Sequence, residues 1–427
     1  MVAVHGVEVD LWAAPSDSRL DVPGVQVRDL AQHDWESSAA GYDRVVYNLG
    51  NNPEFHRAVF DAYLAVPGIV VMHDRSMLSF FLGWLALERR VRPPYPGAAR
   101  FLAMMKQFYG VEGKDAATRL MLSESLAFET DDERKRFTLV EPCLANAVGL
   151  VTHSESALRE MSARAPSHLP ATRLSLPFVD EGLMPDGGLL TRRELGLPQD
   201  KWVLVSSGLL HPSKRVDLLL LAVARSPLLR ERVLVVAVGD TRHAGTYEVQ
   251  LRELAHEMGL DDSLLITGAL DPRQYFSYIQ ASDACAALRN AGNEAASATL
   301  AEQLHFGKPT LVNRTGVFAE MPDDVVIKID TQDEVGSTMR ALESLVENPD
   351  LAARYVVRAR EYAKAELSAA GYAEGLLRFF GTLDCSARLM DEVQEAGADL
   401  LGRARARSLD RLSSEYANKI ASTASCG

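Results

Sequence analysis

The chain has few cysteines and none of the common metal-binding patterns. Its 427 residues include four cysteines, and no two of them form a C-x-x-C pair: Cys143, Cys285, Cys385 and Cys426. This scatter argues against a disulfide framework and against a structural zinc site. There is no H-E-x-x-H motif, and no D-x-D cluster is placed to hold a divalent ion between a strand and a ligand. The sequence therefore predicts a site without a metal.

The chain also lacks an excess of positive charge and a long apolar run. Asp and Glu number 58 against 45 Lys and Arg, which gives a net charge of −13. That charge argues against nucleic acid as a partner. No apolar run reaches the length of a bilayer, and the first residues lack the basic, apolar and cleavage-site regions of a signal peptide. We expect a cytoplasmic protein without a transmembrane segment.

Two glycine-rich nucleotide-binding patterns are missing as well. No G-x-G-x-x-G follows the first predicted strand, and the stretch G-V-E-G-K at residues 110–114 lacks the spacing of a phosphate-binding loop. These absences disfavour a dinucleotide oxidoreductase and a P-loop enzyme.

What the chain has instead is a regular alternation of short apolar runs and helical stretches. Before a linker at 177–188, rich in proline, glycine and acid, strands are predicted at residues 7–12, 43–49, 66–74, 147–152 and 172–176, with a mostly helical stretch at 76–136. After the linker the pattern resumes, with strands predicted at 202–206, 233–238, 263–267, 284–287, 310–312 and 325–329, then helices to about residue 380. This order predicts an α/β protein with two doubly wound, Rossmann-like domains and a ligand cleft at the carboxyl ends of the strands.

Residues 288–309, L-R-N-A-G-N-E-A-A-S-A-T-L-A-E-Q-L-H-F-G-K-P, are the main candidate for the site. They form a predicted polar turn after a strand, followed by a helix of small residues and leucines. Glu294 and Glu302 lie eight positions apart in the sequence. That separation is about 12 Å along a helix, which is similar to the span from a hexose across a diphosphate to a ribose.

The start of that predicted helix suits a diphosphate. The N–H groups of Ala296, Ser297 and Ala298 would face the ligand at the positive end of the helix dipole, and Ser297 or Thr299 can add a hydroxyl. The plainer alternative is that both glutamates are surface carboxylates, because a chain with 58 acidic residues contains many such pairs.

The Glu-x7-Glu spacing, with G-N-E before it and H-F-G-K-P after it, resembles the motif of the retaining GT-B glycosyltransferases of the group-1 family. The resemblance implies that Glu294 contacts the donor sugar and that Glu302 contacts the ribose. It also implies a GT-B fold, in which two Rossmann-like domains face each other across a cleft and C-terminal helices cross back to the first domain. We expect an acceptor-side domain, a nucleotide-sugar domain, and crossing helices with a helical tail, at residues 1–178, 179–366 and 367–427.

The loop G-L-L-H-P-S-K-R at residues 208–215 is a second match. Gly208 lets backbone approach a ligand, and a cation in the loop can neutralise a departing diphosphate. The loop resembles the family's G-x5-K-[RG] donor loop, which assigns Lys214 to the diphosphate. Many members carry arginine directly after the glycine, where this chain has Leu209, so Arg215 is the candidate substitute. From its composition alone, the loop could equally be a solvated turn.

Two further matches and one strand-end glycine supply candidate contacts. V-V-M-H-D resembles the family's V-x-x-H-D, which gives His73 a hydrogen bond to the transferred sugar, although a strand-end histidine more often ties neighbouring loops. N-L-G-N-N resembles a loop of one branch of the family and makes Asn51 and Asn52 candidate sugar contacts, although it is also an ordinary turn composition. Gly268, at a predicted strand end, is a candidate for holding the base through its backbone.

The amino-terminal part departs from the family pattern. The family usually opens with a strand, a glycine-rich loop and a helix before the strand that we predict at residues 7–12. The sequence begins almost at that second strand. We expect either a start codon set too far downstream or a truncated first domain.

The resemblance implies a metal-independent, retaining transfer of a hexosyl group from a nucleoside diphosphate sugar to an acceptor hydroxyl or amine. UDP or GDP is the expected carrier, no cofactor is needed beside the donor, and the acceptor is a small molecule, a lipid or a glycan. The implied catalytic residues are His73, Lys214 and Glu294. Two alternatives stay open: a sugar-nucleotide epimerase of the same architecture, and a catalytically silent sugar-nucleotide-binding or partner protein. The sequence does not indicate the oligomeric state.

Overall fold

The computed structural model of the protein describes residues 6–13, 24–30, 35–86, 96–122, 131–178, 188–242, 244–289 and 295–383. The chain divides into two compact units, Met1–Gly375 and Leu376–Gly427. Both large parallel sheets belong to the first unit, and the domain boundaries expected from the sequence stay a prediction. Glu294, the first glutamate of the predicted pair, lies outside the described residues.

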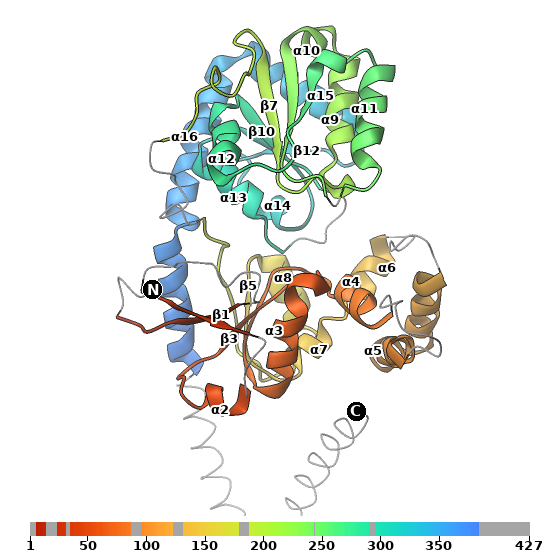
Figure 1. The fold of residues 1–427 in the computed structure, drawn as a ribbon, viewed down its shortest axis with the longest axis vertical. Helices are drawn as coiled ribbons and strands as arrows, with labels where there is room; N and C mark the ends of the chain where they lie inside the picture. Colours follow the sequence, from red (N-terminus) through yellow and green to blue (C-terminus); the bar gives the residue numbers. More distant parts are fainter. Residues whose placement is uncertain are drawn as a thin grey trace, which may run out of the picture. The chain divides into compact units, whose positions relative to one another are not determined.

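The first sheet has four parallel strands in the order β3-β4-β5-β6. Figure 1 labels β3 and β5 of this sheet. Each matches a predicted strand: β3 (Val46–Leu49), β4 (Gly68–Met72), β5 (Ala147–Thr152) and β6 (Ala171–Arg173). Every residue of β4 is buried, as its unbroken apolar run predicts for a central parallel strand. A separate parallel pair joins β1 (Asp10–Ala13) to β2 (Gln26–Asp29). The sequence pattern does not predict β2, because Q-V-R-D contains a single apolar residue.

Helices connect these strands and extend the first half of the chain. They are α2 (Trp35–Ala39), α3 (Pro53–Ala65), α4 (Leu78–Phe81), the π-helix η1 (Leu82–Ala86), α5 (Pro96–Leu122), α6 (Asp131–Arg136), α7 (Glu141–Leu144) and α8 (Glu155–Ser162). Within the described residues, the stretch 76–136 is mostly helical, as predicted.

The second sheet has six parallel strands in the order β12-β11-β10-β7-β8-β9. They are β7 (Trp202–Ser207), β8 (Val233–Val238), β9 (Leu264–Ile266), β10 (Ala284–Ala287), β11 (Thr310–Asn313) and β12 (Ile327–Ile329), each on a predicted run. This is the order of a doubly wound Rossmann sheet, whose strand order reverses between β7 and β10. Ligands of such sheets bind outside the carboxyl ends of the strands at that reversal.

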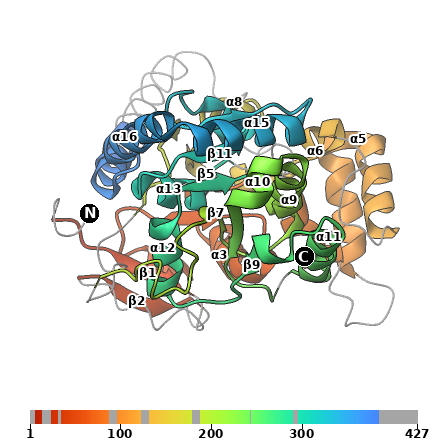
Figure 2. The same cartoon turned by 90° about the horizontal axis from the view of Figure 1, so that it is seen from above.

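Helices cover both faces of the second sheet. In β7, Leu204 belongs to one core cluster with α9 and α15 residues, whereas Val203 and Val205 belong to another with α12 residues. Alternate strand residues point to opposite faces, so both faces are covered (Figure 2). The helices after β7 are η2 (Pro212–Lys214), α9 (Val216–Arg225), α10 (Pro227–Arg232), α11 (Tyr247–Glu257), η3 (Asp261–Ser263), α12 (Pro272–Ala281), α13 (Ala298–His305), α14 (Gly316–Glu320), α15 (Glu334–Glu347) and α16 (Pro349–Glu366).

The chain returns to the first half after α16, as the sequence predicts. Phe178 and Ser368 form an isolated parallel bridge, and the Tyr372 ring lies 6.3 Å from the His153 ring, centroid to centroid. The backbone is helical over 369–383. Ser368 and Tyr372, which follow α16, therefore contact residues that belong to the first half of the chain.

Candidate active site

The loop after β7 folds back on itself and places a lysine beside the start of α13. Gly208 has a φ of +101°, and a Cβ atom added there would lie 2.7 Å from Lys214 Nζ and 3.0 Å from Thr299 Cγ2. Lys214 Nζ donates a hydrogen bond of 3.1 Å to the Ser207 carbonyl. The backbone conformation requires glycine, and a Cβ atom would also displace the Lys214 ammonium from its position beside Thr299. The structure thus brings Gly208, Lys214 and Thr299 together.

Two more glycines from neighbouring strand ends complete this edge. A Cβ atom at Gly239, after β8, would lie 2.2 Å from the Gly208 carbonyl oxygen. Gly239 also forms an isolated antiparallel bridge with Gly268, which follows β9. Because the three strands are parallel neighbours, their carboxyl ends meet at one edge of the sheet, and Gly268 lies there as predicted.

The first turn of α13 carries the expected small and hydroxyl-bearing residues. Ser297 is the N-cap, and its Oγ accepts a hydrogen bond of 3.3 Å from the Leu300 N–H. The first amides of a helix have no carbonyl partner within it, so those of Ala298 and Thr299 point out of the helix start. The Ser297 and Thr299 hydroxyls are 3.2 Å apart, and Ala296 precedes the cap. A concentrated partial positive charge results at this end.

Glu302 lies one turn further along α13, on the side that faces Lys214. Burial raises the pKa of Glu302, while a hydrogen bond from Tyr275 and the charge of Lys214 lower it. The Tyr275 hydroxyl donates that bond to Glu302 Oε2 at 2.7 Å. The structure therefore unites Lys214 and Glu302, which lie far apart in the sequence, beside one helix start.

The structure places Arg215 differently from Lys214. The Arg215 backbone is left-handed, with a φ of +52°. The guanidinium pairs with Glu334 at 3.0 Å and with Asp217 at 3.7 Å. Two carboxylates already offset its charge, so Arg215 would have to leave these partners in order to bind the diphosphate as predicted. That role stays a prediction.

The two candidate asparagines of the first half have local partners. Asn52 caps α3, with its Oδ1 accepting a hydrogen bond of 2.9 Å from the Glu54 N–H. The Asn51 N–H donates to Asp74 Oδ2 at 2.8 Å. The Asn52 oxygen is thus used for helix capping, and sugar contact by either residue stays a prediction.

His73 follows β4 and contacts two polar side chains. Its Nε2 lies 3.1 Å from Asn48 Oδ1, and its Nδ1 lies 3.2 Å from His153 Nε2. Burial lowers the pKa of His73 to about 3, helped by the nearby imidazoles of His153 and His56. Burial also lowers the pKa of His153. Both rings are therefore neutral at physiological pH.

Several site residues are not singled out by the sequence pattern. Gln303 is fully buried, and its Nε2 donates to Ser207 Oγ at 2.9 Å. Arg289, also buried, donates from its guanidinium to Thr299 Oγ1 at 3.2 Å. His153 follows β5 as His73 follows β4. A polar side chain directly after an apolar strand is the signal that would find Arg289 and His153, whereas Gln303 lacks any such signal.

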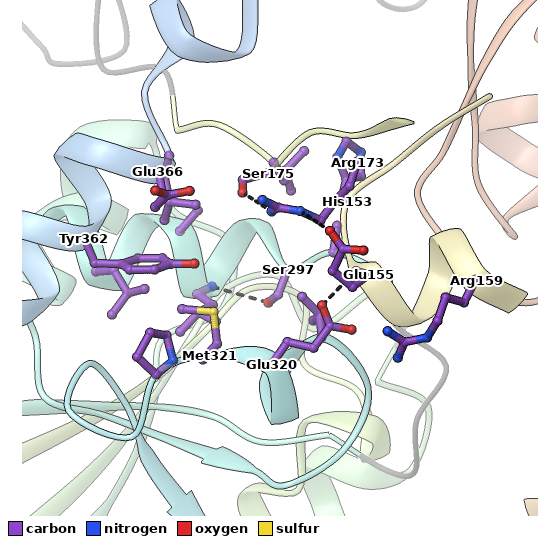
Figure 3. Close-up of a pocket in the computed structure, with 18 residues that line it drawn as sticks. His153, Glu155, Arg159, Arg173, Ser175, Ser297, Glu320, Met321, Tyr362 and Glu366 are labelled. Atoms are coloured by element: carbon purple, nitrogen blue, oxygen red, sulfur yellow. Dashed lines mark hydrogen bonds and ion pairs between the residues drawn. The ribbon is translucent and has the colours of Figure 1, made fainter. Parts of the chain in front are cut away.

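A cavity of about 470 Å³ lies on another face of α13 (Figure 3). Its lining includes Ser297, Leu300, Ala301 and Leu304 of that region, but neither Thr299 nor Glu302. Across it, the Glu320 carboxylate accepts hydrogen bonds of 2.8 and 2.7 Å from the N–H groups of Glu155 and Ser156, at the start of α8. The cavity adjoins the candidate site through Ser297 and His153, which both line it.

Residues 190–362 match the family described as glycosyl transferases, group 1. This part of the chain is a group 1 glycosyltransferase domain. The matched range contains Lys214, the first turn of α13 and Glu302, so the described part of the candidate donor site lies inside it.

A curated relative and two solved structures extend the similarity. D-inositol 3-phosphate glycosyltransferase of Thermomonospora curvata is 29% identical over 282 residues, which cover 61% of this chain and 60% of the relative. The chain thus spans about three fifths of that relative's length. Sucrose-phosphate synthase of Thermosynechococcus elongatus superposes with a TM-score of 0.61 at 14% identity, covering 90% of this chain and 91% of that one. HepE of Anabaena in complex with UDP-glucose gives 0.56 at 15% identity, with 84% and 86% covered. These likenesses confirm the predicted GT-B fold.

Neither a membrane-spanning helix nor a metal-binding cluster is found in the described ranges. No helix there is long and apolar enough to cross a bilayer. No group of three or more His, Cys, Asp or Glu side chains there is placed to hold a metal ion.

Replacing Tyr275 by phenylalanine removes a hydrogen bond that lowers the pKa of Glu302, so this pKa should rise further. Glu302 then takes up its proton at a higher pH. Carbon-13 NMR of the glutamate carboxyls, with the Glu302 signal assigned by its loss in Glu302→Gln, measures the midpoint. Tyr278→Phe, on the same helix, is the control and should leave the midpoint in place. An identical midpoint in Tyr275→Phe and the wild type would contradict the described contact.

Proposed function

We propose that this chain transfers a hexosyl group from a nucleoside diphosphate sugar to an acceptor hydroxyl or amine, with retention of the anomeric configuration. One observation carries the proposal. The Lys214 ammonium lies against Gly208 beside the first turn of α13, and its charge lowers the pKa of Glu302 on the same helix. A cation, outward-pointing amides and a carboxylate on one side of a helix start match the parts of a nucleoside diphosphate.

Similar proteins support this choice of ligand class. HepE, which shares the fold, has been crystallised with UDP and with UDP-glucose. Several curated relatives carry the name D-inositol 3-phosphate glycosyltransferase. A UDP-sugar donor therefore agrees with what binds to a protein of this fold, and a GDP-sugar is the other donor that we propose.

In the proposed reaction, Lys214 and the start of α13 stabilise the departing diphosphate as negative charge develops on it. The bond between the anomeric carbon and the diphosphate oxygen breaks, and the acceptor oxygen or nitrogen bonds to the same face of that carbon. A diphosphate oxygen takes the acceptor's proton. His73 and Glu294 hold the sugar as it becomes cationic, and Glu302 holds the ribose hydroxyls. No metal is needed in this scheme, because the lysine and the helix dipole supply the positive charge.

Separate variants should divide binding from turnover. Glu302→Gln loses a charged acceptor for the ribose and should weaken nucleoside diphosphate binding about 10- to 100-fold, measured by calorimetry. Lys214→Ala should lower kcat about 100-fold, because it removes positive charge where negative charge develops. Glu347→Gln, an exposed residue at the end of α15, is the matched control for binding. If neither Glu302→Gln nor Lys214→Ala changed binding or turnover, the assignment of the donor site would be wrong.

The reaction itself is tested by offering UDP-, GDP- and TDP-sugars with and without acceptor alcohols. The preferred nucleotide is first identified by its thermal shift, since a ligand of the folded state raises apparent stability. We expect donor consumption that depends on the acceptor, and a product with the donor's anomeric configuration by proton NMR. Conversion of donor without acceptor would indicate an epimerase. An inverted product would refute retention, and no consumption of any donor would leave a binding protein.

A further inference from the structure

A chain of hydrogen-bonding groups crosses the carboxyl ends of β3, β4 and β5. It begins at the Leu174 carbonyl, which lies 2.8 Å from His153 Nδ1. It continues from His153 Nε2 to His73 Nδ1 at 3.2 Å, and from His73 Nε2 to Asn48 Oδ1 at 3.1 Å. The two imidazole rings lie 5.0 Å apart, centroid to centroid, with 34° between their planes.

When both imidazoles are neutral, this chain has one proton too few to make all three hydrogen bonds. The Leu174 carbonyl and Asn48 Oδ1 can only accept hydrogen bonds. The chain ends in an acceptor on each side, so its three contacts are all hydrogen bonds only if the four ring nitrogens carry three protons. Two neutral imidazoles carry only two. One contact in the neutral chain therefore joins two acceptors.

Burial and geometry decide which contact lacks its proton. His153 is 3% exposed, and its Nδ1 faces a carbonyl fixed in the backbone at the shortest of the three distances. A proton on His153 Nδ1 leaves Nε2 as a bare acceptor, so His73 Nδ1 must donate to it. The missing proton then falls at His73 Nε2. Asn48, its neighbour there, is exposed, so its amide can turn and another donor can take its place.

The opposite arrangement is less favourable. A proton on His73 Nε2 would satisfy Asn48, but two bare nitrogens of His73 and His153 would then face each other at 3.2 Å inside the protein. Turning an amide replaces its acceptor oxygen with a donor NH2 group, but turning an imidazole does not replace a bare nitrogen with an N–H, so this repulsion would persist. Protonation of the pair would also relieve it, but burial lowers the pKa of both histidines.

We propose that His153 is a positioning residue that fixes the tautomer of His73, so that His73 Nε2 accepts a hydrogen bond from a hydroxyl of the sugar substrate. That this hydroxyl belongs to a sugar rests on the proposed function, whereas the tautomer is a property of the protein alone. His73 thus selects a group that can donate, and Asn48 fills the position in the absence of sugar.

Nitrogen-15 NMR of histidine-labelled protein at pH 7 tests the tautomer directly. Long-range proton–nitrogen correlations distinguish a protonated from a bare ring nitrogen, and the His73 signals are assigned by their loss in His73→Gln. We expect His73 to be protonated at Nδ1 and bare at Nε2 in the wild type. A wild-type His73 protonated at Nε2 overturns the proposal, whatever the variants do.

Two variants then separate His153 from Asn48. His153→Phe keeps a ring of similar size but offers no acceptor, so the His73 proton should move to Nε2 and donate to Asn48 Oδ1. Asn48→Leu removes the other neighbour and should leave the proton on Nδ1. If the His73 tautomer is unchanged in His153→Phe, or altered in Asn48→Leu, a group other than His153 fixes it and the proposal is wrong.

Measurement of kcat/KM then tests whether the His73 tautomer affects the use of the sugar nucleotide. In His153→Phe, kcat/KM for the sugar nucleotide should fall about tenfold, the effect of one hydrogen bond. Binding of the nucleoside diphosphate without sugar should not change. Unaltered kcat/KM in a variant whose tautomer has switched would refute the hydroxyl contact. A failure of the proposed function is distinguishable, because absence of any transferase activity leaves the NMR result intact.

Discussion

The first turns of α13 are held against the end of β7, and the candidate site depends on that contact. Gln303 reaches the Ser207 hydroxyl, Thr299 packs beside Gly208, and Glu302 accepts a hydrogen bond from Tyr275 of α12. These residues lie on one side of the helix, so together they fix its rotation as well as its position. The helix start and Glu302 consequently face the loop that carries Lys214. A side chain at position 208 would separate these parts, which is why glycine is needed there.

The two halves of the chain offer different electrostatic surroundings. The second half gathers positive charge at the helix start, from Lys214, from Arg289 and from the helix dipole. In the first half, His73 and His153 stay neutral because burial lowers the pKa of each. The first arrangement suits a diphosphate that gains negative charge. The second suits a sugar that becomes cationic, because a neutral imidazole adds no repulsion.

The strands of both sheets follow from the sequence because a buried parallel strand is an apolar run that periodicity detects. The meeting of Lys214 with α13 follows as well, since the carboxyl ends of parallel strands share an edge. Other features depend on partners that a local pattern does not contain. Arg215 pairs with Glu334 of α15, and Asn52 caps α3. Strand β2 exists through its pairing with β1, and the His73–His153 contact requires the order of β4 and β5.

Hydrogen–deuterium exchange with and without a nucleoside diphosphate shows directly whether the first turn of α13 binds the diphosphate. We expect slower exchange in peptides that cover residues 296–305 and 208–215 once the nucleotide that gives the largest thermal shift is added, and a smaller effect in Lys214→Ala. Binding confirmed by calorimetry without any protection of residues 296–305 would contradict it.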